Sequence, residues 1–383
     1  MISSFTFVCE IPREFDSGLK NAINRLHFKP TLAFGFVSVE FSLTALMDSF
    51  QSQGISLFGT TSAGVISFSK NEDILLSSGA VFVLTNIPRN AFRLQLLKMD
   101  DFAPDTFGKK IGEIVKQSFK SPNAMISFSG LDTDIQAVID GILKKTGNHL
   151  KMFGGLAGDN LKFKETFVFT ENEITENGAA FIILDGDRFD LQGMTTSGWN
   201  GLGSDFTITR SRGTEVLEID GNPALDLYAN YLNVSEEELP MISIEYPLMI
   251  KNPDGTTSFR TITKIDRQER AIIFSSSISP GTVFSFSASP GFEILEKTRE
   301  KVIQFHENHQ DANLMILYSA IAREMAIGPL ISTEIKLATI KWKVPLAGCF
   351  SYGEIASDDD HPCKFYNQSF SLAILTEKPV HDL

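Results

Sequence analysis

The sequence is poor in cysteine. It contains three, Cys9, Cys349 and Cys363, an odd number that does not suit the paired framework of a disulfide-rich secreted domain. No two of them form a C-x-x-C pair, so the usual zinc and dithiol redox motifs are missing. Because free thiols persist in a reducing compartment, we expect a cytoplasmic protein that holds no metal.

Long apolar runs and positive charge are also scarce. No stretch of about 18 uninterrupted apolar residues occurs, and the N-terminal segment lacks the basic start and apolar centre of a signal peptide. Lysine and arginine number 34 against 47 acidic residues, which gives a formal net charge of −13. This deficit argues against a basic surface for nucleic-acid phosphates or anionic lipids. We therefore expect neither a nucleic-acid nor a membrane partner.

Several catalytic and cofactor motifs are missing as well. The glycine-rich segments lack the G-x-G-x-x-G spacing of dinucleotide-binding folds, and no lysine follows them as in a phosphate-binding loop. The two loops that contain serine also miss the G-x-S-x-G pattern of a nucleophile elbow, since position 60 is threonine and position 349 is cysteine. We therefore expect no cofactor.

Three glycine-rich loops dominate what is present. Gly59-x-x-Ser62-x-Gly64-x-Ile66 has the same spacing as Gly348-x-x-Ser351-x-Gly353-x-Ile355, and Phe153–Asn160 reads FGGLAGDN. Each loop follows a short apolar segment typical of a buried strand. Loops at strand ends are where α/β folds build binding sites, and their free amides suit a small anion. The alternative is that small residues only allow neighbouring segments to pack closely.

The order of predicted elements indicates an α/β fold. A strand, a helix, a glycine loop and a further strand occur three times, which we interpret as an internal repeat. The chain of 383 residues favours two domains. We predict mixed sheets covered by helices, in two tightly packed domains at 1–222 and 223–383. Within the first, strand 74–85 is expected to pair with strand 92–96 as a hairpin.

Glu354 and Arg323 are the charged residues that the sequence most clearly suggests for a binding site. Glu354 lies among glycines and apolar residues, where an isolated charge is costly, so we expect it to pair with Arg323. This pair would either brace the fold or bind the ammonium and carboxylate groups of a ligand. The predicted ligand-binding residues are Ser62, Gly64, Gly155, Asp159, Asn160, Arg323, Ser351, Tyr352, Glu354 and Asn367.

Two other functions remain open from the residues alone. Cys349 or Ser351 could be the nucleophile of an uncharacterised enzyme. The chain could also be an interaction scaffold with no ligand, in which case the glycine loops would be closed and filled by phenylalanine side chains.

Seven segments make the chain resemble the FIST family of sensory proteins, which have paired FIST N and FIST C domains. In the N-terminal half these are GTTSAGVI and FGGLAGDN, and at the junction SGWNGLGSDFTIT followed by RGTEVLEIDGNPALDLY. In the C-terminal half they are YSAIAREMAIG, PLAGCFSYGEIAS and HPCKFYNQSF. The chain departs from the family pattern at Thr60, Val65 and Ala320, where cysteine, glutamate and cysteine are frequent.

The resemblance implies a sensor of small ligands in signal transduction, with amino acids or their derivatives as proposed ligands. In other members these domains are joined to output modules. The chain has no room for such a module, so we expect the signal to pass to a separate partner protein. Because Val65 replaces the frequent glutamate, the first loop is not expected to match the role of the Glu354 loop.

Overall fold

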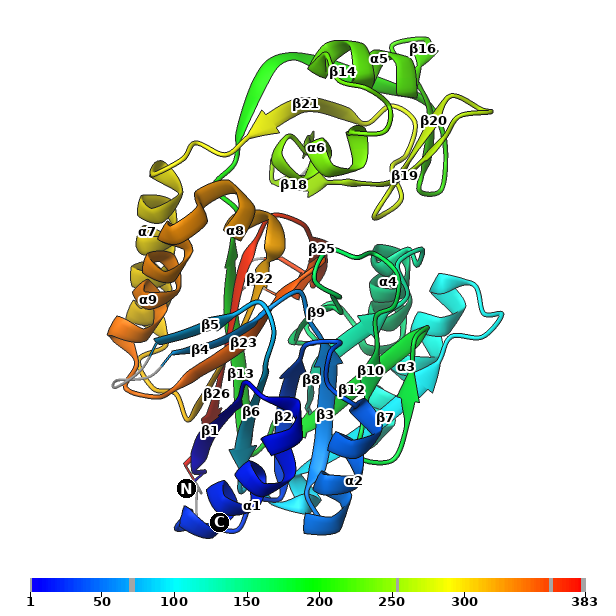
Figure 1. Cartoon of the computed structure of the whole chain (residues 1–383). Helices are drawn as coiled ribbons and strands as arrows, with labels where there is room; N and C mark the ends of the chain where they lie inside the picture. Colours follow the sequence, from blue (N-terminus) through cyan, green and yellow to red (C-terminus); the bar gives the residue numbers. More distant parts are fainter. Residues whose placement is uncertain (1, 69–72, 253–254, 358–360, 380–383) are drawn as a thin grey trace.

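The computed structural model describes residues 2–68, 73–252, 255–357 and 361–379. The fold is mixed α/β, as predicted: three six-stranded sheets form a body, and a fourth sheet forms a module beside it (Figure 1). We call residues 200–288 the β-module. Within the described ranges, no helix has the length and apolar character needed to cross a membrane.

The three sheets of the body mix strands from distant parts of the chain. The first has the order β1 (Ser4–Cys9), β6 (Ala80–Thr85), β2 (Leu32–Val37), β3 (Ser56–Thr61), β10 (Val168–Phe169) and β11 (Ile174–Thr175). The second has the order β25 (Lys364–Tyr366), β24 (Glu354–Ala356), β9 (Met152–Leu156), β8 (Pro122–Ser129), β12 (Gly178–Asp185) and β7 (Phe92–Lys98). The third has the order β13 (Phe189–Thr196), β26 (Phe370–Glu377), β22 (Leu314–Ala320), β23 (Leu346–Ser351), β4 (Val65–Phe68) and β5 (Asp73–Leu76).

Each sheet is built on the same plan. Two parallel strands are joined by helical chain, as β2–α2–β3, β8–α4–β9 and β22–α8–α9–β23, and an antiparallel strand (β6, β12 or β26) lies beside the first of them. The helices concerned are α2 (Leu43–Gln53), α4 (Ile135–Thr146), α8 (Ile321–Ile327) and α9 (Ile331–Lys341). The two serine-containing loops and the FGGLAGDN loop therefore leave equivalent strand ends.

Local sequence sets the limits of these helices. The Ser42 hydroxyl accepts a hydrogen bond from the Ala45 amide at the start of α2, and Asp134 does the same for Ala137 in α4. Such side chains satisfy amides that lack a partner within the helix. Gly54 then ends α2 in the left-handed conformation, at φ 63°, where glycine meets no steric penalty.

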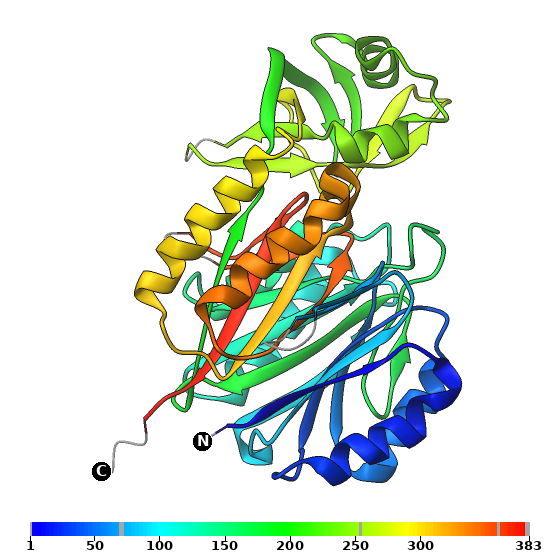
Figure 2. The same ribbon diagram turned by 60° about the vertical axis from the view of Figure 1, so that its left-hand side comes forward.

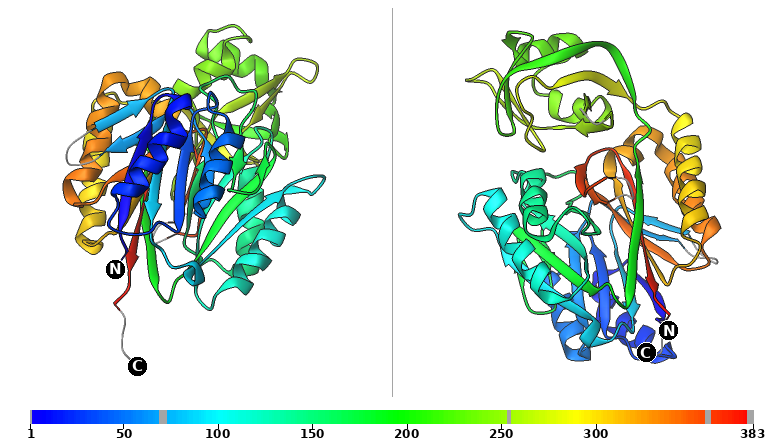
Figure 3. Two further views of the ribbon diagram at one scale, coloured as in Figure 1. Left: turned by 60° about the horizontal axis from the view of Figure 1, so that its bottom comes forward. Right: turned by 180° about the vertical axis from the view of Figure 1, so that it is seen from behind.

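Helices cover the outer face of each sheet, and the inner faces share one core. Helices α1 (Phe15–Arg25) and α2 cover the first sheet, α3 (Pro104–Ser118) and α4 the second, and α7 (Glu293–Asn308) and α9 the third (Figures 2 and 3). The shared core contains aromatic rings from all three sheets, such as Phe36, Phe153 and Tyr318. The rings of Phe36 and Tyr318 meet edge to face at 5.6 Å.

The predicted hairpin between strands 74–85 and 92–96 is wrong. Segment 74–85 is split into β5 and β6, and β7 pairs with β12 in the second sheet rather than with β6. The physical reason is that both edges of β6 are occupied, one by β1 and the other by β2. The chain therefore leaves the first sheet after β6 and supplies an edge strand to the next one.

The described residues of the β-module form one further sheet and two helices. Its order is β18 (Thr257–Arg260), β17 (Leu248–Lys251), β21 (Val283–Ala288), β14 (Asn200–Arg212), β15 (Glu215–Ile219), β20 (Ala271–Phe274) and β19 (Ile262–Asp266), with β16 (Asn222–Pro223) beside β15. Helices α5 (Ala224–Leu232) and α6 (Leu239–Glu245) complete it. Two chain connections, 197–199 and 289–292, join the module to the body (Figure 3, right).

Candidate functional site

The three glycine loops meet in the body and bond to one another through their backbones. The Ala63 amide donates to the Phe350 carbonyl at 2.9 Å, which joins the first loop to the third. The Gly158 amide donates to Thr61 at 3.0 Å and joins the second to the first. The second and third loops are linked by a 2.8 Å hydrogen bond from the Leu156 amide to Gly353. Segments separated by up to about three hundred residues thus form one cluster, as strand-end loops of parallel units are expected to do.

Close packing explains the glycines of this cluster. A Cβ atom at Gly155 would lie 2.7 Å from the Tyr318 ring, and one at Gly158 would lie 2.6 Å from the Ala63 nitrogen. Both distances are shorter than van der Waals contact allows. Gly155 and Gly158 therefore let backbones and rings approach, and the loop amides named above serve each other rather than an anion.

The first loop is sealed in the same way. The Ser62 amide donates to Val37 at 3.0 Å, and the Ser62 hydroxyl is buried with no hydrogen-bond partner among the described residues. A Cβ at Gly64 would lie 2.9 Å from the Phe350 ring. Ser62 and Gly64 are therefore packed inside the body, which is the arrangement expected of the scaffold alternative for this loop.

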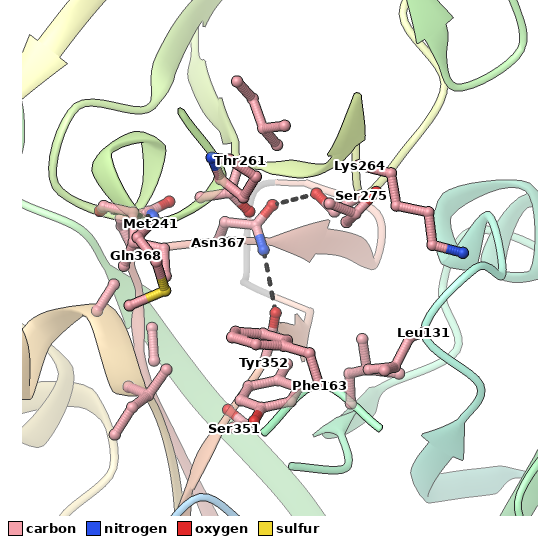
Figure 4. Close-up of a pocket in the computed structure, with 18 of the residues that line it drawn as sticks. Leu131, Phe163, Met241, Thr261, Lys264, Ser275, Ser351, Tyr352, Asn367 and Gln368 are labelled. Atoms are coloured by element: carbon pink, nitrogen blue, oxygen red, sulfur yellow. Dashed lines mark hydrogen bonds between the residues drawn. The ribbon is translucent and has the colours of Figure 1, made fainter. Parts of the chain in front are cut away.

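A cleft of about 320 Å³ lies beside the third loop, between the body and the β-module. Figure 4 shows its wall, to which the third loop contributes Ser351 and Tyr352 and the following segment contributes Asn367 and Gln368. The facing wall belongs to the β-module and includes Thr261–Lys264, Met241, Ile244 and Ser275. The volume falls at the lower end of the range of roughly 300–1,000 Å³ that is usual for small-molecule sites.

Asn367 ties the two walls together. Its Nδ2 donates to the Tyr352 carbonyl at 3.3 Å, and its Oδ1 accepts a hydrogen bond from the Ser275 hydroxyl at 2.8 Å (Figure 4). At the rim, Lys264 and Asp132 form an ion pair across the cleft at 2.6 Å. Both the Asn367–Ser275 hydrogen bond and the Lys264–Asp132 ion pair join the body to the β-module. They therefore depend on the position of the β-module relative to the body.

Comparison with known protein families shows which family the chain belongs to. The family model of the FIST N domain matches residues 31–222, and that of the FIST C domain matches residues 224–357. The chain belongs to the FIST family. No curated protein matches the chain. FIST domains are associated with sensor proteins of signal transduction, and the third sheet of this FIST protein joins strands from both matched regions.

Of the residues predicted to bind a ligand, Ser351, Tyr352 and Asn367 lie on the wall of the cleft. The others do not line it: they are Ser62, Gly64, Gly155, Asp159, Asn160, Arg323 and Glu354. Ligand contact by the first three residues stays a prediction. Sequence reasoning missed the β-module wall and helix α6, because strand periodicity in residues 245–286 does not reveal which strands face a distant loop.

Asp159 and Asn160 shape the second loop of this FIST chain. The Asp159 carboxylate accepts hydrogen bonds from the Phe163 and Lys164 amides at 2.9 and 2.7 Å, and from the Tyr352 hydroxyl at 2.5 Å. The Phe163 ring stacks on Tyr352 with 4.7 Å between centroids. Asn160 adopts a positive φ of 56° and its side chain reaches Glu40. Asp159 thereby fixes the Tyr352–Phe163 stack that forms part of the cleft wall.

The predicted ion pair between Arg323 and Glu354 is not formed. Arg323 pairs instead with Glu334 on α9, and it also donates to Thr298 and to the carbonyls of Ser197 and Gln368. Both Arg323 and Glu334 have no exposed side-chain surface. The bracing role considered for Arg323 is therefore the one that its contacts support, with Glu334 in place of Glu354.

Glu354 is held by hydroxyl groups. Its carboxyl oxygens accept hydrogen bonds from the Ser351 and Ser369 hydroxyls at 2.7 Å each, and from the Ser369 amide at 3.2 Å. Burial raises the pKa of Glu354 to about 8, although these hydrogen bonds and the charge of Arg323 oppose the change. This carboxyl group inside the body is therefore mostly protonated at pH 7 and ionises above that pH.

This raised pKa predicts a specific pH dependence of stability. Since the folded pKa exceeds the ordinary value of 4.5, the stability that Glu354 contributes is fully present below pH 4.5 and is lost as pH rises through about 8. One pKa unit corresponds to about 1.4 kcal/mol. Relative to Glu354→Gln, we expect the wild type to lose at least about 2 kcal/mol of unfolding free energy between pH 5 and pH 9.

Urea denaturation across this pH range measures the difference. Glu300→Gln removes an exposed carboxyl from α7 and is the matched control, for which the difference from wild type should stay constant. Parallel stability curves for wild type and Glu354→Gln would contradict the raised pKa.

Proposed function

We propose that this FIST protein is a sensor that binds a small molecule in the cleft between the body and the β-module. The observation that carries the proposal is the cleft itself, which combines a largely apolar wall with a few polar groups next to the third glycine loop. Such a combination is the usual form of a small-molecule site. The family assignment supports a sensory role.

A ligand in this cleft would touch both parts of the molecule. It would therefore favour one position of the β-module over others, because a ligand shifts an equilibrium by its difference in affinity for the two states. The connecting segments include Gly198 and Gly291 with φ of 91° and 64°, conformations that glycine adopts readily. We propose that the position of the module is the signal that a separate output protein reads.

The proposal includes a cytoplasmic location, which agrees with the three free cysteines and the reducing conditions that keep thiols unpaired. It also includes division of the chain into a FIST N-like part at 1–222 and a FIST C-like part at 223–383. The common plan of the three body sheets supports an internal repeat as the origin of the body.

A blocking substitution tests the cleft. Met241 is 44% exposed at the cleft wall, whereas Ile340 is 68% exposed near the end of α9 and does not line it. We expect Met241→Trp to weaken binding of any cleft ligand at least tenfold, because the indole fills the cavity, while Ile340→Trp binds as the wild type does. Thermal shift with a small-molecule panel, followed by calorimetry on the hits, measures this.

Two results would count against the proposal. Equal affinities for wild type and Met241→Trp would place the ligand elsewhere. A panel with no binder would favour the scaffold alternative.

One observation favours an enzyme as the second candidate. Ser351 lines the cleft with 1% of its surface exposed, and its hydroxyl donates to Glu354 at 2.7 Å. The ionised form of Glu354 could activate this hydroxyl as a nucleophile. Cys349 is a poorer candidate, because burial and the charge of Glu354 raise the pKa of its thiol, which keeps it protonated. Labelling by a fluorophosphonate that disappears in Ser351→Ala would support the enzyme.

A further inference from the structure

The wall of the cleft consists mainly of apolar side chains, with uncharged polar groups between them. Its apolar members include Leu131, Leu156, Phe163, Ile244, Ile262 and Ile321. We infer that the ligand is an uncharged, largely apolar molecule that donates hydrogen bonds, rather than a free amino acid. This inference rests on the proposed function, because it describes what the same cleft accepts.

The charged groups near the cleft are already engaged or lie off the wall. Asp132 and Lys264 line the rim and pair with each other at 2.6 Å, with both side chains more than half exposed. Glu354 lies behind Ser351, which donates to it. Arg323 is bound to Glu334. A zwitterion would therefore enter without a free countercharge among the described wall residues, and a buried charge without a partner is strongly unfavourable.

Arg260 precedes the wall residue Thr261 and needs separate consideration. Its guanidinium is buried and donates to the Phe259 carbonyl at 2.7 Å, while its Nε has no hydrogen-bond partner among the described residues. It does not line the cleft. Asp134 acts on Arg260 electrostatically, so a charge of opposite sign is already near. Because this buried cation lies next to a wall residue, comparing the affinities of anionic and neutral ligands tests whether Arg260 attracts a negative charge into the cleft.

Two hydroxyl groups of the wall, those of Ser275 and Thr263, donate their protons to other groups of the protein. The Ser275 hydroxyl donates to the Asn367 side-chain oxygen at 2.8 Å. Thr263 donates to the Ile273 carbonyl at 3.1 Å. A hydroxyl oxygen that has donated its proton still carries acceptor lone pairs. The wall consequently offers acceptors to a ligand, which suits hydroxyl or amide N–H groups on the ligand.

The size and shape of the cleft further limit the class of ligand that fits. The cleft of about 320 Å³ lies near the lower limit of roughly 300 Å³ for small-molecule sites, which favours a small ligand. The stacked Tyr352 and Phe163 rings present aromatic surface on one side (Figure 4), against which a flat ring packs well. A neutral aromatic amide or alcohol of small size meets all these conditions.

Matched compounds separate this inference from the proposed function. N-acetyl-L-phenylalaninamide and L-phenylalanine share one side chain but differ in charge, and benzamide and benzoate do likewise. N,N-dimethylbenzamide keeps the ring and carbonyl of benzamide but has no N–H. Dissociation constants at pH 7 are measured by calorimetry or saturation-transfer NMR for wild type, Met241→Trp and Ile340→Trp.

We expect each neutral compound with an N–H to bind at least tenfold more tightly than its charged counterpart, and benzamide at least threefold more tightly than its dimethyl derivative. These differences should vanish in Met241→Trp and persist in Ile340→Trp. If L-phenylalanine or benzoate binds as tightly as its neutral counterpart and Met241→Trp abolishes that binding, the inference fails and the proposed function stands. If binding of the neutral compounds is unaffected by Met241→Trp, the cleft is not the site and both fail.

Discussion

Replacing Arg323 by methionine is expected to lower the free energy of unfolding by about 3–5 kcal/mol, which is typical of removing one partner from a buried ion pair. The change leaves Glu334 with no exposed surface and without its cation. It also removes the hydrogen bonds to the carbonyls of Ser197 and Gln368. These bonds connect α8 to the chain that follows β13 and to the chain that precedes β26. Urea denaturation followed by circular dichroism measures the loss.

The double variant Arg323→Met/Glu334→Leu distinguishes ion pairing from packing. Because it removes both charges together, it should recover much of the lost stability. The exposed pair Lys336–Asp73, with Lys336 59% exposed, provides the control, and Lys336→Met should cost less than about 1 kcal/mol. A loss below that level for Arg323→Met would contradict the bracing role.

Substitution of Gly154 or Gly348 by alanine is expected to have the other largest effect. A Cβ at Gly154 would lie 1.6 Å from the Ile126 carbonyl oxygen, and one at Gly348 would lie 1.9 Å from that of Leu317. Each obstacle is the backbone of the neighbouring parallel strand, so no side chain can turn away to make room. We expect each variant to lose at least about 3 kcal/mol, the upper end of the usual overpacking range, or to fail to fold.

Gly18→Ala is the matched control. Gly18 lies in α1, and its added Cβ would meet only the end of the Phe7 ring, at 3.1 Å. Alanine favours the helix by about 1 kcal/mol, so this variant should be nearly as stable as the wild type. Thermal melting shows the contrast, and unchanged melting of Gly154→Ala and Gly348→Ala would show that these strands can separate.

The sequence was informative where local pattern determines structure. Spacing of glycine and serine in two loops, each after an apolar strand, correctly predicted that the loops would meet, since they leave equivalent strand ends of sheets that pack against one another. In the structure, the Ser42 and Asp134 side chains cap the starts of α2 and α4, which is local sequence setting local structure. The α/β class and the family followed from the same segments.

Long-range pairing was harder to predict. The acidic partner of Arg323 proved to be Glu334, eleven positions away in the sequence, rather than Glu354, because the turn between α8 and α9 brings that carboxylate back to the guanidinium. Strand β7 was expected to pair with the strand just before it in the chain, but it pairs with β12 in the second sheet. Neither periodicity nor charge in a single segment specifies which sheet supplies its neighbour.

The cleft depended on long-range arrangement most of all. Ser351, Tyr352 and Asn367 were singled out in the sequence, but the opposite wall comes from the β-module, whose strands carry no site motif. The loop amides of Ala63, Leu156 and Gly158 donate to carbonyls of neighbouring loops, so these three do not serve an anion. What remains for a ligand is the apolar surface and the acceptor oxygens next to the third loop.

A crystal structure of the protein soaked with N-acetyl-L-phenylalaninamide tests most directly whether this cleft is a ligand site. We predict electron density for the compound between Tyr352 and the Thr261–Lys264 segment, with its N–H groups directed at hydroxyl or carbonyl oxygens of the wall. Ordered compound at another place on the protein, with only water between the β-module and the third glycine loop, would contradict the proposal.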